Sequence, residues 1–247
     1  MAYGEYKEKT TATSKDEVLT IEGKVRHKLG RNNKGTLVIT GNVGDVVGRD
    51  NEGTITITGN AGDNVGLDNK EIITVNGNAR NGVGTDNKGT ITITGNAGNG
   101  VGDGNQGTIT VNGKAGKGVG ESNKGTIIVN RNAGKGVGSG NEGTITVEGN
   151  AGDNVGLDNK EIITVNGNAG NFVGESNEGT IIVKGDAGER VGHDNHGIII
   201  VEGTIKELHK KASGIIIAKD VKKDHGILWF KRDSNEVRFE YINARST

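Results

Sequence analysis

The feature that most constrains this chain is an 18-residue repeat, of which residues 53–70, GTITITGNAGDNVGLDNK, are one copy. Eleven copies follow one another without insertion, and they begin at Glu17, Gly35, Gly53, Glu71, Gly89, Gly107, Gly125, Gly143, Glu161, Gly179 and Gly197. A short repeat of constant length is typical of a solenoid, in which each coil buries its apolar side chains only against its neighbours. We therefore expect one elongated repeat domain over residues 17–203.

Apolar and polar residues alternate over the second to sixth positions of the copies. The third position is always Leu or Ile and the fifth always Ile or Val, whereas the second, fourth and sixth are mostly Thr, Asn or Glu. This alternation predicts a strand with one buried and one outward face. The ninth position, Val25 to Ala187, and the thirteenth, Leu29 to Val191, add two inward points to each coil. The predicted fold is all-β, a single-stranded parallel β-helix of about 11 coils.

Glycine and asparagine mark the turns between strands. Gly occupies the seventh and the fourteenth positions in ten copies each, where its tolerance of positive φ would let the coil bend. The seventeenth position is Asn in ten successive copies: Asn33, Asn51, Asn69, Asn87, Asn105, Asn123, Asn141, Asn159, Asn177 and Asn195. Stacked in register, these side chains would form a ladder, each amide donating to one coil and accepting from another. The alternative is that Asn is only a favourable turn residue, as in the partial Asn column at the eighth position.

The segments outside the repeat are expected to cover the two ends of the solenoid, whose unpaired strand edges would otherwise stack on another chain. Residues 1–16, with Tyr3 and Tyr6, are predicted to form the N-terminal cap, and residues 204–247 the C-terminal cap. Should either cap fail to cover its edge, self-association through the solenoid ends would follow.

Two elements are predicted within the C-terminal cap. The sequence from Thr204 to Glu207 resembles a capping box and predicts a short helix over residues 204–213. Residues 227–230 and 236–242 flank a turn-like segment and predict a β-hairpin. The alternative for residues 214–247 is a tail that binds a partner.

The composition disfavours several classes of function. Thirty basic and 31 acidic residues are interspersed and give a net charge of −1, so no surface for nucleic acid or anionic membrane lipid is expected. The chain has no Cys and therefore no disulfide or thiolate-metal framework. Residues 1–23 contain charges and no apolar run, so neither a signal peptide nor a membrane span is expected. A cytoplasmic location, or export without a cleaved signal peptide, is the resulting prediction.

One segment of the repeat has a family resemblance. Residues 163–174, ITVNGNAGNFVG, follow the pattern I-x-V-x-G-N-A-G-x-x-V-G, which resembles the repeats of the GXGXG right-handed β-helix family. That family includes the C subunit of formylmethanofuran dehydrogenase and the carboxy-terminal domain of large glutamate synthase subunits. The resemblance covers most of residues 17–203 and implies a right-handed helix that serves as a structural module. It also implies the alternative function of a structural subunit in a larger redox enzyme complex, with the cofactors in other domains.

Outward-facing threonines are the candidate surface-binding residues. They are Thr54, Thr56, Thr58, Thr90, Thr92, Thr94, Thr108, Thr110, Thr144 and Thr146. Such arrays resemble those of ice-binding proteins, in which regular hydroxyl and methyl groups order water. Aliphatic residues interrupt the columns at Val38, Ile72, Ile128, Ile162 and Ile182, and Thr is in any case favourable on an exposed strand.

No metal, cofactor or catalytic site is expected. The acidic column at the sixteenth position, for example Asp50 and Asp68, lacks the G-G-x-G-x-D pattern of calcium-binding rolls and is interpreted as a column of turn residues. His193 and His196 have the spacing of a metal pair but no third convincing ligand. Catalysis needs one environment-tuned site, whereas near-identical coils repeat the same side chains many times.

The sequence therefore predicts a non-catalytic scaffold or interaction module. Identical groups that recur at the strand spacing would bind a protein or a repetitive surface through many weak contacts. Ice binding by the Thr columns is the alternative that arises from the same residues.

Overall fold

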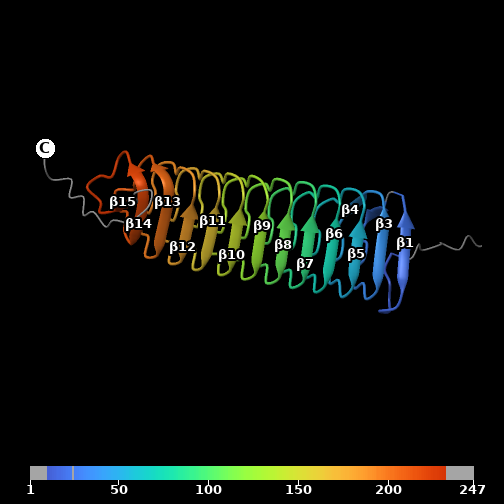
Figure 1. Cartoon of the computed structure of the whole chain (residues 1–247). Coiled ribbons are helices and arrows are strands. Elements are labelled where there is room, and N and C mark those ends of the chain that lie inside the picture. The colour runs from blue at the N-terminus through green and yellow to red at the C-terminus, as the bar shows by residue number, and fades with distance from the viewer. Residues whose placement is uncertain (1–9, 24, 232–247) are drawn as a thin grey trace, which may run out of the picture.

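This structure, a computed structural model, describes residues 10–23 and 25–231. Within these ranges the chain forms fifteen strands and no helix (Figure 1). The strands are β1 (Val18–Glu22), β2 (Val25–His27), β3 (Thr36–Thr40), β4 (Val43–Asp45), β5 (Thr54–Ile57), β6 (Ile72–Val75), β7 (Thr90–Ile93), β8 (Thr108–Val111), β9 (Thr126–Val129), β10 (Thr144–Val147), β11 (Ile162–Val165), β12 (Thr180–Val183), β13 (Ile198–Ile205), β14 (Ile215–Val221) and β15 (Phe230–Lys231).

One parallel sheet runs the length of the molecule. Thirteen strands lie side by side in the order β1, β3, then β5 to β15, and β2 pairs with β4 in a separate two-stranded sheet. From β1 to β13, each strand of the long sheet pairs with its counterpart in the next coil, as Thr90 with Thr108 and Ile91 with Ile109, an offset of one repeat. The predicted all-β parallel solenoid with 18-residue coils is therefore confirmed, and Figure 1 shows it as a rod with its strands along one side.

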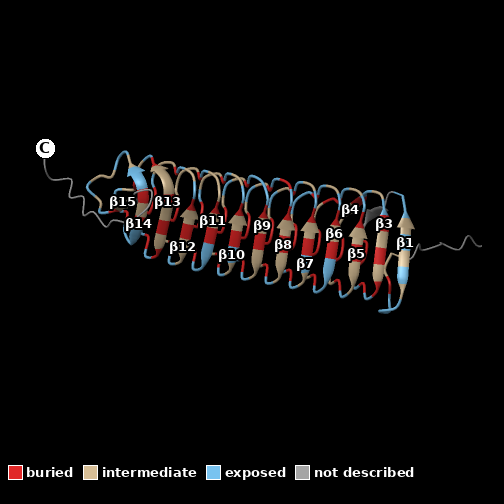
Figure 2. Cartoon of the chain, viewed as in Figure 1, coloured by how far each residue is buried: buried red, intermediate tan, exposed pale blue. Residues whose placement is uncertain are grey.

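The core is a thin column of aliphatic side chains inside the coil. Residues at the third and fifth positions are fully buried from β3 to β13, and so are those at the thirteenth position from Val47 to Val191. The buried stretches of each strand alternate with half-buried or exposed ones in Figure 2, as the sequence alternation predicts. At the N-terminal end, Leu19 and Ile21 are only half-buried, because β1 pairs with a coil on one side alone.

The two glycine columns serve different purposes. At the fourteenth position Gly has positive φ, as at Gly66 with 72°, and a Cβ there would overlap the Cδ1 atom of Ile91. At the seventh position the expectation of positive φ is wrong from Gly59 onward. There the coils approach so closely that a Cβ on Gly77 would lie 2.6 Å from the carbonyl oxygen of Gly59. Glycine is thus needed at one corner for its backbone conformation and at the other for the absence of a side chain.

The asparagine ladder is confirmed. All ten Asn residues of the seventeenth position are completely buried. In each of the first nine, the Nδ2 atom donates to the Oδ1 atom of the Asn one coil later, as from Asn105 to Asn123 at 2.9 Å. The same Nδ2 also donates to a backbone carbonyl two residues ahead, here that of Gly107. The ladder therefore satisfies polar groups that the turn would otherwise leave buried without a partner.

The C-terminal end differs from the prediction. The predicted helix over residues 204–213 is wrong, because Ile205 ends β13 and Leu208 pairs with Val191 of the preceding coil. The side chains of Ile205 and Leu208 are both completely buried. Their spacing in the sequence therefore arises from two core-facing positions of one more coil and not from one face of a helix. A further strand of the long sheet, β14, follows Gly214, and β15 pairs with it in parallel. The second strand of the predicted hairpin, residues 236–242, lies outside the described residues.

Residues 10–12 lie against the first coil. The carbonyl oxygens of Thr10 and Ala12 accept from the amides of Gly30 and Lys34 at 2.8 and 2.9 Å. The Ala12 amide in turn donates to Oδ1 of Asn33, and the Ala12 side chain is completely buried. The Ala12 amide thereby takes the place of the side-chain donor that a preceding Asn supplies elsewhere in the ladder. Tyr3 and Tyr6 lie outside the described residues.

Candidate interaction surface

The outward face of the long sheet brings the predicted threonines together in columns. Register places the second positions of successive strands side by side, for example Thr108 beside Thr90 and Thr126. The fourth positions form a parallel column in which Thr56, Thr74, Thr92 and Thr110 occupy four consecutive strands. Neighbouring members of a column lie about 4.8 Å apart, the spacing of strands in a sheet.

These threonines are accessible, and most have free hydroxyl groups. Thr90 and Thr144 are exposed, and Thr54, Thr56, Thr92, Thr108, Thr110 and Thr146 are half-buried between neighbouring strands. Among the described residues, none of these eight hydroxyls has a protein hydrogen-bond partner. Thr58 differs, because its Oγ1 accepts from the Gly41 amide at 3.0 Å. The hydroxyls of the second and fourth columns are therefore available to an external ligand.

The second and fourth columns of the face carry no charge, whereas the sixth position has Glu22, Glu148, Lys184 and Glu202. From β1 to β14 the second and fourth positions contain only Thr, Ile and Val. Charged residues lie beside it at the eighteenth position, where several are paired. The Nζ atom of Lys70 lies 2.7 Å from Oε1 of Glu52, and that of Lys160 lies 2.8 Å from Oε1 of Glu142. These lysines donate hydrogen bonds that hold the pKa of Glu52 and Glu142 below its usual range.

The composition of the face changes along the rod. Threonine predominates on β5 to β10, whereas six isoleucines lie on the outward face of the last four long strands. These residues, which we name the isoleucine patch, are Ile162, Ile182, Ile198, Ile200, Ile215 and Ile217. Sequence reasoning treated Ile162 and Ile182 as interruptions of the Thr columns and missed the patch. Extending both columns to residue 217 would have revealed it.

The sides of the coil away from this face are occupied by structural hydrogen bonds. At the eighth position, Asn Oδ1 atoms accept from the backbone amide of the next coil, as Asn60 does from Asn78 at 2.8 Å. The eleventh position forms a similar ladder that sequence reasoning missed, as where Asp63 Oδ1 accepts from the Asn81 amide at 2.9 Å. Mixed Asp, Asn, Lys and Glu residues at this position concealed the column. These side chains are engaged by the fold itself.

The acidic column at the sixteenth position has a conformational explanation. Asp50, Asp68 and Asp86 have φ between 51° and 53°, in the left-handed region that Asp, Asn and Gly tolerate best. The replacement of Asp by Ser122 and Gly140 at equivalent turns, with φ of 51° and 60°, follows the same requirement. Within residues 10–23 and 25–231, no three His, Asp or Glu side chains are grouped so that they could hold a metal ion.

Four of the five histidines lie near the C-terminal end of the solenoid. His193 lies 3.3 Å from carboxylate oxygens of both Glu175 and Asp194. Its ring packs edge-on against His209, with centroids 4.1 Å apart, whereas His196 is exposed. No sequence pattern indicates the His193–His209 contact, because the contact depends on how the last coil is folded.

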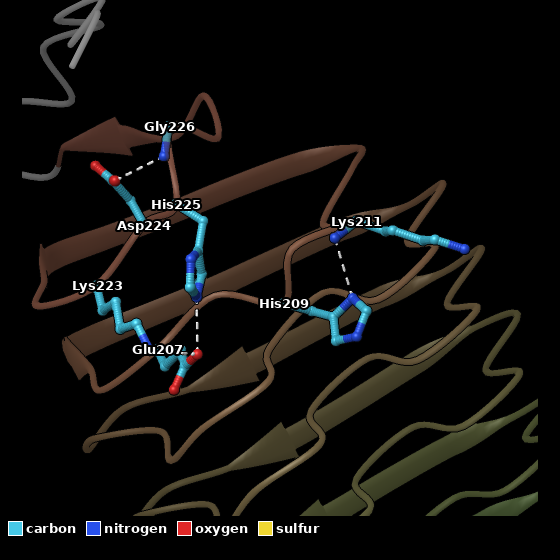
Figure 3. A network of polar contacts seen from close by, with 7 residues as sticks. All are labelled: Glu207, His209, Lys211, Lys223, Asp224, His225 and Gly226. Carbon is cyan, nitrogen blue, oxygen red and sulfur yellow. Dashed lines mark hydrogen bonds and ion pairs between the residues drawn. The ribbon is translucent and has the colours of Figure 1, made fainter. Parts of the chain in front are cut away.

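Three further polar contacts hold the last coil together (Figure 3). The Nε2 atom of His225 donates to Oε1 of Glu207 at 2.8 Å, and Nζ of Lys223 lies 3.1 Å from the same oxygen. The His225 hydrogen bond is the main cause that holds the pKa of Glu207 below its usual range. The Nδ1 atom of His209 accepts from the Lys211 amide at 3.1 Å (Figure 3). Burial lowers the pKa of His209, with smaller contributions from the nearby positive charges of His193 and Arg190.

Comparisons with known proteins add no relative. No family model, no curated protein and no solved structure matches this chain. The resemblance to the GXGXG repeats and the right-handed sense that it implies stay predictions. In the part of the chain that the structure describes, no helix is long and apolar enough to cross a membrane.

Proposed function

We propose that this protein is a non-catalytic rod that binds an uncharged, repetitive partner through the Thr columns of β5 to β10. The observation that carries the proposal is the in-register array of hydroxyl and methyl groups on these strands, free of charge and of protein partners for the hydroxyls. A partner with a matching repeat would make the same weak contact at each strand. Because the sheet holds these groups in place, little side-chain entropy is lost on binding, and the contacts add up.

The lack of charge in the second and fourth columns bears on the class of partner. Nucleic acids and anionic lipids are recognised through Lys and Arg, which are absent from the second and fourth columns. Hydroxyl and methyl groups instead match neutral polymers, such as polysaccharides, that offer hydroxyl groups and apolar ring faces. Binding through such contacts should be nearly independent of salt, because screening acts only on charges.

Co-sedimentation with particles of crystalline cellulose and of chitin tests this proposal. We expect the protein to pellet with at least one of them, equally at about 50 mM and about 500 mM salt. A double variant with Thr92→Lys and Thr110→Lys should bind at least about tenfold more weakly, because charges must be desolvated against a neutral partner.

The matched control carries the same two charges on another side of the coil. Asn96→Lys and Asn99→Lys place Lys where the next coil already has Lys114 and Lys117. This control should bind as the unaltered protein does. Equal binding by the face variant and the control, or no binding of the unaltered protein to either polymer, would refute the proposal.

Ice is a second candidate for the repetitive partner. The specific observation in its favour is the uninterrupted fourth column on β5 to β8, which presents four threonines at the regular spacing of strands. Thermal hysteresis of the purified protein distinguishes the two candidates. Hysteresis that is abolished by Thr92→Lys and Thr110→Lys would identify ice as the partner, and no hysteresis at high protein concentration would eliminate it.

A further inference from the structure

The isoleucine patch is the largest aliphatic area on the outward face. Register places Ile198 beside Ile215 in the second column, and Ile182, Ile200 and Ile217 one after another in the fourth. Ile162 is 44% exposed and Ile215 is 43% exposed, and the other four are half-buried. Figure 2 shows these half-buried and exposed stretches on β11 to β14. None of the six belongs to the buried core or packs against it.

Five of the six are contiguous, whereas Thr180 lies between Ile162 and Ile198 in the second column. A contiguous aliphatic area of this kind is unfavourable in water and marks a surface that something covers. The first coils of the same sheet show that the fold does not require isoleucine here, because Thr occupies the same columns on β5, β7, β8 and β10. The change from Thr to Ile therefore alters the surface without altering the coil.

The end of the described chain lies at the margin of the patch. β15 pairs with β14 so that Phe230 is beside Ile217, the last member of the fourth column. Residues 232–247 follow immediately. Trp229 independently indicates that this end of the molecule has a further contact, because its Nε1 atom is buried with no hydrogen-bond partner among the described residues. Groups outside these residues are expected to complete this end of the molecule.

The sequence that follows suits an aliphatic surface. In residues 236–242, EVRFEYI, the apolar residues Val237, Phe239 and Tyr241 alternate with Glu236, Arg238 and Glu240. An extended segment would therefore present an apolar face and a charged face. Its apolar residues recur about every 6.6 Å along the segment.

We propose that residues 232–247 of this chain dock on the isoleucine patch, with Val237, Phe239 and Tyr241 against it and the charged side chains toward water. The segment is long enough, because about six extended residues span the width of four strands. It is also tethered at the margin of the patch, so its effective concentration there exceeds that of any free partner. Docking would cover β11 to β14 and leave the Thr columns of β5 to β10 open.

Cysteine accessibility tests this proposal in the full chain, which has no native Cys. Ile200→Cys and Thr92→Cys introduce a thiol at the same position of the coil, and both residues are half-buried within the described part of the chain. We expect a water-soluble maleimide to modify the thiol of Ile200→Cys at least about tenfold more slowly than that of Thr92→Cys, because only the former would be covered.

Two further variants show what provides the protection. Truncation after Lys231 should raise the rate for Ile200→Cys to that for Thr92→Cys, and so should Phe239→Ser with Tyr241→Ser in the full-length chain. The control Glu240→Ser, on the charged face of the segment, should leave the protection unchanged. The double serine variant keeps the chain length, so the conclusion does not depend on the truncated protein folding.

Two outcomes would overturn the proposal. Equal rates for Ile200→Cys and Thr92→Cys in the full chain would mean that the patch is uncovered. Protection that disappears on dilution, or that survives both the truncation and the double serine substitution, would assign the patch to a second copy of the chain. Neither outcome bears on binding by the Thr columns, which the polymer and ice assays test separately.

Discussion

Substitution of Asn123, in the middle of the ladder, tests whether the seventeenth column stabilises the fold by donating hydrogen bonds. The Nδ2 atom of Asn123 donates to the Gly125 carbonyl at 3.0 Å and to Oδ1 of Asn141 at 2.9 Å. Its Oδ1 accepts from Nδ2 of Asn105 at 2.9 Å and from the Gly125 amide at 3.2 Å. Asn123→Ala removes all four contacts, whereas Asn123→Asp keeps the shape and the acceptors but removes the donor.

The expected magnitudes follow from which groups lose their partners. In Asn123→Ala, the second Nδ2 proton of Asn105 is left buried, but Gly125 and Asn141 each retain another hydrogen bond. One unsatisfied buried donor together with a small cavity should lower the free energy of unfolding by about 2–4 kcal/mol. In Asn123→Asp, a buried carboxylate faces the Oδ1 atom of Asn141, so the loss should exceed that of Ala and reach about 4 kcal/mol or more.

Urea unfolding at pH 7, followed by far-ultraviolet circular dichroism, measures these losses. Hydrogen exchange should accompany it, because a solenoid can unfold one block of coils at a time. The control is Asn96→Ala, an exposed residue whose Oδ1 accepts only from the Lys114 amide, with an expected loss of about 0.5–1.5 kcal/mol. If Asn123→Asp were as stable as Asn123→Ala, or if the control lost as much as either, the ladder argument would be wrong.

Two more predictions concern single positions of the coil. Gly120→Ala should destabilise the protein by about 2–3 kcal/mol, because φ is 71° there and the new Cβ would overlap the Cδ1 atom of Ile145. Gly118→Asn should change the free energy of unfolding by less than about 0.5 kcal/mol. Its φ of 69° lies in the left-handed region that Asn tolerates, and the nearest atom lies 3.9 Å from the Cβ position, so the side chain has room. Equal thermal midpoints for Gly120→Ala and Gly118→Asn would contradict this pair of predictions. Because the pKa of His209 is lowered in the folded protein, His209 of the unfolded chain takes up a proton at a higher pH than His209 of the folded protein. The contribution of neutral His209 to the free energy of unfolding is therefore complete above the ordinary pKa of 6.5 and is lost as the pH falls below that value. The drop in the urea midpoint from pH 7.5 to pH 5.5 should be smaller for His209→Asn than for the unaltered protein, and an unchanged drop would show that His209 is not its cause.

The repeat itself could be predicted almost completely from the sequence. Each column has one environment, and eleven copies report on it independently, so the inward third and fifth positions and the Asn ladder were identified without the structure. The Thr columns follow from the same alternation, because neighbouring residues of a strand point to opposite faces. Their accessibility and free hydroxyls needed the structure, since these depend on what the neighbouring coils place beside them.

The C-terminal coil could not be predicted in this way because it occurs only once. Ile205, Leu208 and Ala212 have the spacing of an amphipathic helix, and the same spacing also serves a coil that is one residue shorter than the others. Pairing of Leu208 with Val191 decides between the two, and that contact lies seventeen residues back along the chain. Local sequence preference carries no information about it.

The sequence by itself determined the period, the inward columns and the ladder, because each is a property of one coil stacked on its copies. Tertiary structure alone decided the features that depend on the exact approach of one coil to another. Among them are the absence of any side chain at Gly77 and the contact between His193 and His209. The isoleucine patch belongs with them, since its five contiguous members on β12, β13 and β14 form one surface only when parallel pairing sets them side by side.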